Sequence, residues 1–259
     1  MIRAVLRRLG RNKTIWKRLP PDLGGGRVCC SPEALLSVWK PGWQSKQALV
    51  LFDWARRYVR PGMHVWDVGA HQGLFAFAAA AVCGSKGEVV AFEPDPYLVN
   101  LMERSIATGS HRGAPVRVLP VAVSDKHAVA TFLIAATDRT LNHLATAQGN
   151  PRTGGSRASR LVMVATMDWL SEELVPPDLV KIDVEGAEGA TLGASLALLK
   201  QHRPALIVEV AGENIGTVGD ILREADYLMF DVADPRKGPL TSPAWNTLAV
   251  PRECKSEYL

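Results

Sequence analysis

The stretch Val65-Trp66-Asp67-Val68-Gly69-Ala70-His71-Gln72-Gly73 decides the fold of this chain. Residues 64–68 predict a short buried strand, because valine and tryptophan favour strands. Gly69 and Gly73 allow the backbone a tight turn and a close approach to a ligand. The apolar run Leu74–Cys83 predicts a helix directly after the turn, and the first N–H groups of a helix have no partner within it. The segment therefore predicts a strand, a turn and a helix whose start can bind a ligand.

The rest of the chain continues this alternation of strands and helices, which is typical of a parallel sheet with crossover helices. A helix over residues 46–59 precedes the first strand, with Ser45 as its N-cap and Pro61 after its end. The further predicted strands are 88–92, 116–123, 179–182, 205–210, 227–232 and 247–250, and the further helices are 97–108, 187–200 and 219–225. The fold class is therefore α/β, a mostly parallel sheet of seven strands with helices on both faces.

Two parts of the chain depart from this alternation. Residues 126–177 predict an inserted hairpin, in which strands at 128–134 and 161–165 flank a polar loop. A long loop in a compact domain is usually functional, so we expect it to lie over the site. Residues 1–45 are predicted to form a basic helical extension or lid, with helices over Arg3–Leu19 and Ala34–Lys40, ahead of a main domain at 46–259.

The charge distribution limits the partners. Residues 1–18 carry seven basic and no acidic side chains, so the remaining residues carry 23 basic against 26 acidic ones. A chain-wide basic field that would bind a phosphate backbone is excluded, and no nucleic-acid partner is expected. A helix over residues 1–19 would present a short apolar face among arginines. Peripheral contact with an anionic membrane is therefore one hypothesis for this segment, and a solvated arm or a lid is the other.

The sequence also indicates a compartment. The longest apolar run has ten residues, about half of the ~20 needed to cross a bilayer. Arginines interrupt the N-terminal region where a signal peptide has its apolar stretch. The four cysteines, at 29, 30, 83 and 254, have neither disulfide nor metal-ligand spacing, so they are predicted to be reduced thiols. We therefore predict a cytoplasmic protein.

Glu93 lies twenty residues after Gly73, at the end of the next predicted strand. An acidic residue in that place can accept both hydroxyls of a ribose, as in sheets that bind dinucleotides or S-adenosylmethionine. His71 fills the position where a dinucleotide fingerprint has its middle glycine, so a charged amino-acid group fits the turn better than a pyrophosphate. Asp67 is the candidate partner for the ammonium of such a group.

A second acidic segment, Leu179-Val180-Lys181-Ile182-Asp183-Val184-Glu185-Gly186-Ala187-Glu188, follows another predicted strand. Strand ends beside the switch point of a doubly wound sheet line the ligand crevice, so Asp183 and Glu185 are expected to project toward the glycine turn. The alternative is a solvated helix start, where acidic side chains favour the helix dipole.

Five segments in this order resemble the FkbM family of S-adenosylmethionine-dependent methyltransferases: DVGAHQG (67–73), AFEPDP (91–96), PVAVSD (120–125), KIDVEGAE (181–188) and IVEV (207–210). The resemblance implies a Rossmann-like methyltransferase sheet, with S-adenosylmethionine as the cofactor and S-adenosylhomocysteine as the product. The cofactor-binding residues that it implies are Asp67, Gly69, Ala70, His71, Gly73, Glu93, Pro94, Ala122, Ser124, Asp125 and Asp183. His71 departs from the asparagine that this family often carries.

The resemblance further implies methyl transfer to a hydroxyl of a sugar, a glycan or a natural product. Such a reaction needs a base, and the candidates are Asp183, Glu185, His71 and His143. Asp183 and Glu209 could instead hold a divalent cation, but without a third ligand no metal is predicted. The alternative functions are an RNA methyltransferase, whose Asn-Pro-Pro-Tyr type strand end is not found here, and a non-catalytic nucleoside-binding protein. Acceptor specificity is expected to come from residues 1–45 and 135–160, with Trp39, Trp43 and Trp169 as candidates for stacking.

Overall fold

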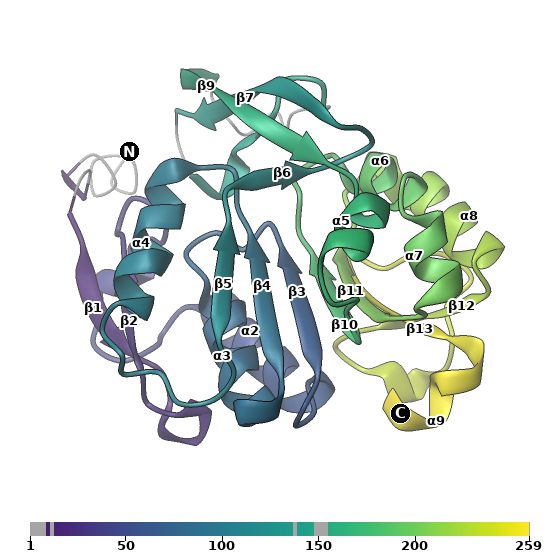
Figure 1. Cartoon of the computed structure of the whole chain (residues 1–259), viewed down its shortest axis with the longest axis horizontal. Helices are drawn as coiled ribbons and strands as arrows, with labels where there is room; N and C mark the ends of the chain where they lie inside the picture. Colours follow the sequence, from purple (N-terminus) through teal and green to yellow (C-terminus); the bar gives the residue numbers. More distant parts are fainter. Residues whose placement is uncertain (1–8, 11–12, 137–138, 148–154, 259) are drawn as a thin grey trace.

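A computed structural model describes residues 9–10, 13–136, 139–147 and 155–258 of the chain. Within these residues a seven-stranded sheet runs in the order β12-β13-β11-β10-β3-β4-β5 (Figure 1). Its strands are β3 (His64–Val68), β4 (Glu88–Phe92), β5 (Val116–Leu119), β10 (Leu179–Ile182), β11 (Ala205–Glu209), β12 (Tyr227–Asp231) and β13 (Asn246–Pro251). All neighbours pair in parallel except β13, which is antiparallel to both β11 and β12. The predicted α/β fold class is confirmed.

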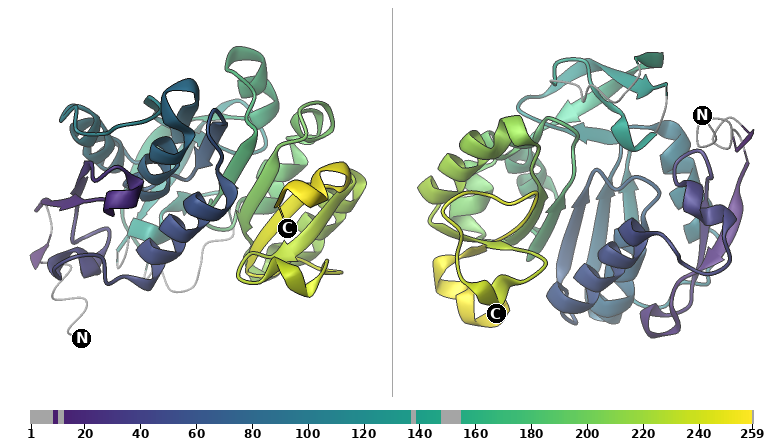
Figure 2. Two further views of the ribbon diagram at one scale, coloured as in Figure 1. Left: turned by 90° about the horizontal axis from the view of Figure 1, so that it is seen from below. Right: turned by 180° about the vertical axis from the view of Figure 1, so that it is seen from behind.

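Helices cover both faces of the sheet (Figures 1 and 2). One face carries α2 (Lys46–Tyr58), α3 (Leu74–Cys83) and α4 (Pro96–Ile106), and the other carries α5 (Met167–Glu173), α6 (Glu188–Gly193), α7 (Leu196–Gln201) and α8 (Ile215–Glu224). The short helix α9 (Lys255–Tyr258) follows the last strand. Successive strand residues point to opposite faces, so Val65 joins the core under α2 and α3 while Trp66 joins the core on the other face. Both faces are buried, which explains why these strands are nearly continuous apolar runs.

The strand order contains one switch point, between β3 and β10. From β3 the chain proceeds through β4 to β5 at one edge, and then returns to β10 and β11 on the opposite side of β3. The loops that follow β3 and β10 therefore diverge at the carboxyl ends of these strands. In open α/β sheets this is where ligands bind.

The insertion and residues 121–123 before it form a separate small sheet above these strand ends (Figure 1). Its strands β6 (Val121–Val123), β7 (Ala128–Ala135), β8 (His143–Leu144) and β9 (Ser156–Ala165) lie in the order β6-β9-β7-β8. The expected hairpin is found as the antiparallel pair β7 and β9. The single strand predicted over residues 116–123 is two strands instead, because Pro120 lacks the N–H that would continue the ladder between β5 and β6.

The prediction of a helix over Arg3–Leu19 is wrong from residue 13 onward. Strand β1 (Ile15–Arg18) pairs antiparallel with β2 (Arg27–Cys30), and the hairpin packs beside α4 (Figure 1). Pro20 and Pro21 cannot continue a helix from residue 18, and the glycines at 24–26 allow the chain to reverse. The helix predicted over Ala34–Lys40 is a 3-10 turn at Leu36–Trp39. Residues 1–8 and 11–12 of the other predicted helix lie outside the described residues.

Two further differences concern helices. The helix predicted over residues 187–200 is divided into α6 and α7, and at the break the Ser195 hydroxyl donates to the Thr191 carbonyl. Helix α5, capped by Thr166, was not expected from the sequence. Among the described residues, no helix is long and apolar enough to cross a membrane.

Candidate active site

The glycine turn between β3 and α3 is built around Gly69. Its φ of 77° lies in the left-handed region, and its N–H donates to the Phe92 carbonyl at 3.0 Å. A Cβ on Gly69 would lie 1.9 Å from the backbone oxygen of Asp183, so no other residue fits between β3 and the loop after β10. Gly73, with a φ of 80°, is the N-cap of α3. Beside this contact, the carboxyl ends of the strands border an open space.

That space is a cavity of about 260 Å³ above the switch point. The cavity is lined by the turn at 69–72, the end of β4 at 92–94, strand β6, residues 139–144 of the insertion, and the ends of β10 and β11. The turn, the acidic strand ends and the insertion, which are far apart in the sequence, therefore meet at one site. The expectation that the insertion lies over the site agrees with this arrangement.

Glu93 receives two backbone hydrogen bonds at the end of β4. Its Oε2 accepts from the N–H of His71 and its Oε1 from the N–H of Asp95, each at 2.8 Å. Only 5% of the residue is exposed, and burial raises the pKa of Glu93 to about 8 against these hydrogen bonds. Each carboxylate oxygen can accept more than one hydrogen bond, so both can also receive ligand hydroxyls.

The His71 side chain faces the same cavity from the turn. Its backbone has a φ of 56°, which is uncommon for a residue other than glycine. Burial lowers the pKa of His71 to about 4, so the imidazole is neutral at pH 7. Its buried Nε2 has no hydrogen-bond partner among the described residues, and the same is true of Gln72 Nε2. Both nitrogens are therefore available to a ligand.

Lys181 connects the two strands at the switch point. Its ammonium nitrogen lies 3.1 Å from Asp67 Oδ1 and 3.4 Å from Asp183 Oδ2, and it donates to the Gly69 carbonyl at 3.0 Å. Burial acts to lower the pKa of Lys181, but Asp67 and Asp183 outweigh it and raise that pKa. The ammonium is therefore charged, and it holds the turn against β10.

The acidic side chains after β10 and β11 fall into two groups. Asp183, Glu185 and Glu209 line the cavity. The pKa of Glu209 is raised to about 8, first by burial and then by repulsion from Asp183. Glu188 is buried away from the cavity, where its Oε1 accepts from the Gly186 N–H at 3.0 Å and its Oε2 from Asn214 Nδ2 at 2.5 Å. Glu188 therefore holds the loop after β10 in place.

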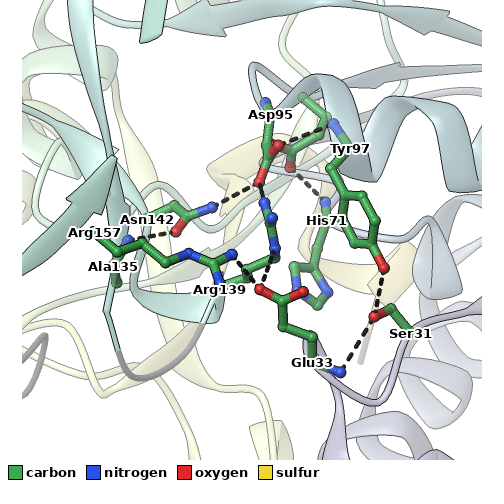
Figure 3. A network of polar contacts seen from close by, with 10 residues as sticks. Ser31, Glu33, His71, Asp95, Tyr97, Ala135, Arg139, Asn142 and Arg157 are labelled. Carbon is green, nitrogen blue, oxygen red and sulfur yellow. Dashed lines mark hydrogen bonds and ion pairs between the residues drawn. The ribbon is translucent and has the colours of Figure 1, made fainter. Parts of the chain in front are cut away.

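A network centred on Arg139 joins the insertion to two other parts of the chain (Figure 3). The Arg139 guanidinium pairs with Glu33 of the N-terminal segment and with Asp95 after β4, and its carbon lies 4.3 Å from the centre of the Tyr97 ring. Asn142 also donates to Asp95, at 3.0 Å, and Arg157 pairs with Glu33. The charges of this network are mostly buried, which makes their pairing necessary.

The structure brings most of the predicted site residues to the cavity. Those that line it are Gly69, Ala70, His71, Glu93, Pro94, Ala122, His143, Asp183 and Glu185. Four cofactor-binding candidates do not line it: Asp67, Gly73, Ser124 and Asp125. Asp67 is fully buried. Its Oδ2 accepts from the Ala76 N–H at 3.1 Å and its Oδ1 lies beside the Lys181 ammonium, so both carboxylate oxygens contact protein groups. The Ser124 hydroxyl donates to Asp125 at 3.4 Å.

Sequence reasoning missed several residues of the cavity. Lys181 and Arg139 line it, as does Trp245, whose side chain is largely exposed. The tryptophans named as candidates for stacking, Trp39, Trp43 and Trp169, do not line it. Lys181 belongs to the acidic segment after β10, and its position on a buried strand was a usable signal. Arg139 and Trp245 stand in polar loops without periodicity, where the sequence offers no such signal.

The structure also bears on metal binding. Among the described residues, no group of three or more histidine, cysteine, aspartate or glutamate side chains is arranged to hold a metal ion. Asp183 and Glu209 both line the cavity, and Lys181 supplies the positive charge beside them.

Comparisons with known proteins give the following likenesses. Residues 67–229 match the family model described as the methyltransferase FkbM domain. Among solved structures, a methyltransferase FkbM from Methylobacillus flagellatus KT has a TM-score of 0.44 and 14% identity, over 77% of this chain and 50% of that one. The chain thus spans half the length of that protein. No curated protein sequence matches the chain.

Two other solved structures are methyltransferases. A precorrin-6y C5,15-methyltransferase from Geobacter metallireducens GS-15 has a TM-score of 0.45 and 12% identity, over 82% of this chain and 90% of that one. A 16S rRNA N2 G1207 methyltransferase from T. thermophilus, in complex with AdoMet and guanosine, has a TM-score of 0.46 and 13% identity, over 92% of this chain and 50% of that one.

Proposed function

Because the chain belongs to the FkbM methyltransferase family, whose cofactor is S-adenosylmethionine, we propose that it methylates a hydroxyl of a sugar, a glycan or a natural product. The observation that carries the proposal is the meeting of two kinds of residue in one cavity. The glycine turn and Glu93 form a nucleoside-binding edge, and Asp183 and Glu209 place carboxyl groups beside it. A hydroxyl acceptor needs such a group, because its proton must leave as the methyl group arrives.

The residues at the turn fit the cofactor. Because Gly69 has no side chain, the turn can pack against the backbone of Asp183. Glu93 has the position and the lone pairs to accept the ribose hydroxyls. Ala122 and its neighbours on β6 are apolar and would face the adenine. The unpartnered nitrogens of His71 and Gln72 are available to the carboxylate of the methionine part. When bound, S-adenosylmethionine supplies an electrophilic methyl carbon on a positively charged sulfur.

The protein's own part in the reaction is to align the acceptor and to receive a proton. Asp183, Glu209, Glu185, His71 and His143 all line the cavity and are the candidate bases. Glu209 is favoured among them because a base is most effective when its pKa lies near the working pH, and its pKa is about 8. Lys181 is held between Asp67 and Asp183, so it fixes the position of Asp183 relative to the turn.

Calorimetric titration with S-adenosylhomocysteine tests the cofactor half of the proposal. Wild type is expected to bind, and Glu93→Gln is expected to bind at least about tenfold more weakly, because the amide replaces one of the two acceptor oxygens with an NH2 group that cannot accept a ribose hydroxyl. Glu103→Gln, an exposed glutamate on α4, is the matched control and should bind as wild type does. Absence of binding by folded wild type would contradict the proposal.

The acceptor half is tested by incubation with S-adenosylmethionine labelled on the methyl group. Sugar and natural-product pools and an RNA pool are offered separately. Label in an alkali-stable ether of a hydroxylated small molecule supports the proposal. Label in RNA alone would keep the methyltransferase activity and overturn the acceptor class.

A further inference from the structure

A second cavity lies directly beside the first, under the amino-terminal half of α2. It has a volume of about 250 Å³, and we call it the α2 cavity. Its helix wall includes Val50, Leu51 and Trp54, and its sheet wall includes Asp183, Glu209 and Asn246. Asp183 and Glu209 line both cavities, so the two spaces meet at these carboxyl groups.

The strand register explains why these polar side chains share one wall. Glu209 on β11 lies directly opposite Asn246 on β13, and residues opposite each other point to the same face of a sheet. Asp183 follows the pair Ile182 and Val208, so it projects to the same face as Glu209. The register therefore produces a row of polar groups across three strands, on the face that α2 covers.

One group in this row lacks a hydrogen-bond donor. Asn246 Oδ1 is buried and has no hydrogen-bond partner among the described residues. A buried acceptor without a donor is costly, and in native proteins it often marks a ligand or water site. Its neighbour Glu209 is hydrogen-bonded to Trp245, and burial, followed by repulsion from Asp183, raises the pKa of Glu209 to about 8. A ligand hydroxyl would supply the donor that Asn246 Oδ1 lacks.

The wall opposite the polar row indicates that a ligand would also carry apolar groups. Trp54 is mostly buried, and with Val50 and Leu51 it presents an apolar surface across from the polar row. Gln47 lines both cavities from the same helix and adds an amide. A ring that carries hydroxyl groups on its rim and C–H groups on its faces matches these two walls, because aromatic side chains pack on its apolar faces.

We propose that the α2 cavity is the acceptor subsite and that it binds a hydroxylated ring of the sugar class, with one hydroxyl donating to Asn246 Oδ1 and the reacting hydroxyl beside Glu209. This inference rests on the proposed methyl transfer. In the step itself, the ionised Glu209 carboxylate takes the proton of the reacting hydroxyl, and the hydroxyl oxygen forms a bond to the methyl carbon. The carbon–sulfur bond breaks and its electron pair stays on sulfur, so the products are a methyl ether, a neutral thioether and protonated Glu209.

The test uses Asn246, because it lines the α2 cavity and does not line the first cavity, which lies beside the glycine turn. The full chain is saturated with S-adenosylhomocysteine, and saturation-transfer NMR measures its binding of a panel of methyl glycopyranosides. Wild type is expected to bind at least one glycoside. Asn246→Leu, which keeps the size of the side chain and removes the amide oxygen, is expected to bind that glycoside about tenfold more weakly. Asn100→Leu, an exposed asparagine on α4, should leave glycoside binding unchanged.

Two further measurements separate this role from a structural one. S-adenosylhomocysteine affinity should be the same in wild type and in Asn246→Leu. The midpoint of thermal unfolding should not fall in Asn246→Leu, because removing an unpartnered buried oxygen costs no hydrogen bond. If that variant does not fold, Val50→Phe narrows the α2 cavity from the helix wall and serves as the second variant.

The outcomes are distinguishable. Equal glycoside binding by wild type and Asn246→Leu overturns the acceptor subsite, and so does the absence of glycoside binding in wild type that binds S-adenosylhomocysteine. Failure of wild type to bind S-adenosylhomocysteine contradicts the proposed function instead.

Discussion

Lys181 on β10 lies opposite Asp67 on β3, and its ammonium nitrogen is 3.1 Å from Asp67 Oδ1. Both side chains are almost fully buried, so each charge depends on the other. Because Lys181 also donates to the carbonyl of Gly69, the pair ties the glycine turn to the strand that carries Asp183. The geometry of the glycine turn therefore depends on this buried ion pair.

Replacing one member of this pair should destabilise the protein strongly. Lys181→Met leaves Asp67 buried without its cation, which typically costs about 3–5 kcal/mol in the free energy of unfolding. Urea denaturation measures this. Lys200→Met is the matched control, because Lys200 pairs with Glu224 at 2.8 Å on the surface, where the loss is expected to be at most about 1 kcal/mol. Equal losses in the two variants would contradict the dependence on burial.

Gly69→Ala is expected to abolish S-adenosylhomocysteine binding and to lower the thermal midpoint. The new methyl group would meet the backbone of Asp183, which cannot move without breaking the contact between β3 and β10. Gly62→Ala is the control, because Gly62 also has a positive φ, of 86°, but no atom lies within 4 Å of its added Cβ. It should show only the backbone strain of about 1–2 kcal/mol and bind S-adenosylhomocysteine normally.

Arg139→Met should release the insertion from the rest of the site. Glu33 keeps Arg157 as a partner, but Asp95 loses its guanidinium and retains only the neutral donors Asn142 Nδ2 and the Tyr97 N–H. Hydrogen exchange is expected to become faster over residues 139–144 and around Glu33, with weaker S-adenosylhomocysteine binding. Arg160→Met, at an exposed arginine that donates to the carbonyl of Ser159, should leave exchange in these segments unchanged. Unchanged exchange in Arg139→Met would show that the network does not hold the insertion.

The raised pKa of Glu209 predicts a pH dependence of stability. The unfolded chain releases this proton near the ordinary pKa of 4.5, whereas the folded chain releases it near 8. Between these pH values the folded state binds more protons, so the free energy of unfolding falls as pH rises. Glu209→Gln removes this contribution and should flatten the fall between pH 5 and 8, measured by urea denaturation. Glu93 has a similar pKa, so part of the slope should remain.

Glu103→Gln is the control for this pH series, because the side chain is exposed. Its slope between pH 5 and 8 should equal that of wild type. A wild-type slope that persists in full in Glu209→Gln would show that this carboxyl group does not retain its proton in the folded protein.

Much of the fold could be predicted because the relevant signals are local. The apolar strands and the glycine turn at 65–73 indicate a parallel sheet, and the family predicted from five motifs is confirmed by the match over residues 67–229. The acidic strand ends at Glu93 and Asp183 could also be placed, since the carboxyl ends of parallel strands share one edge.

The N-terminal segment shows where local signals fail. The spacing of apolar residues before Leu19 is compatible with a helix, but Leu19, Leu23 and Val28 are buried in the core that includes α2 and α3. That burial is available to the hairpin and depends on residues far away in the sequence. Tertiary packing therefore decided a segment whose own propensity was weak.

The sequence by itself determined the sheet, the glycine turn and the family, because alternation of strands and helices and the freedom of glycine are properties of neighbouring residues. Only the tertiary structure decided which polar groups meet. Arg139 pairs with Glu33 across 106 positions of the chain, Asp67 is turned to Lys181 and away from the cavity, and Asn246 lies opposite Glu209 through strand register. These pairings are set by the burial of charge and by hydrogen bonding between distant strands, which no local pattern encodes.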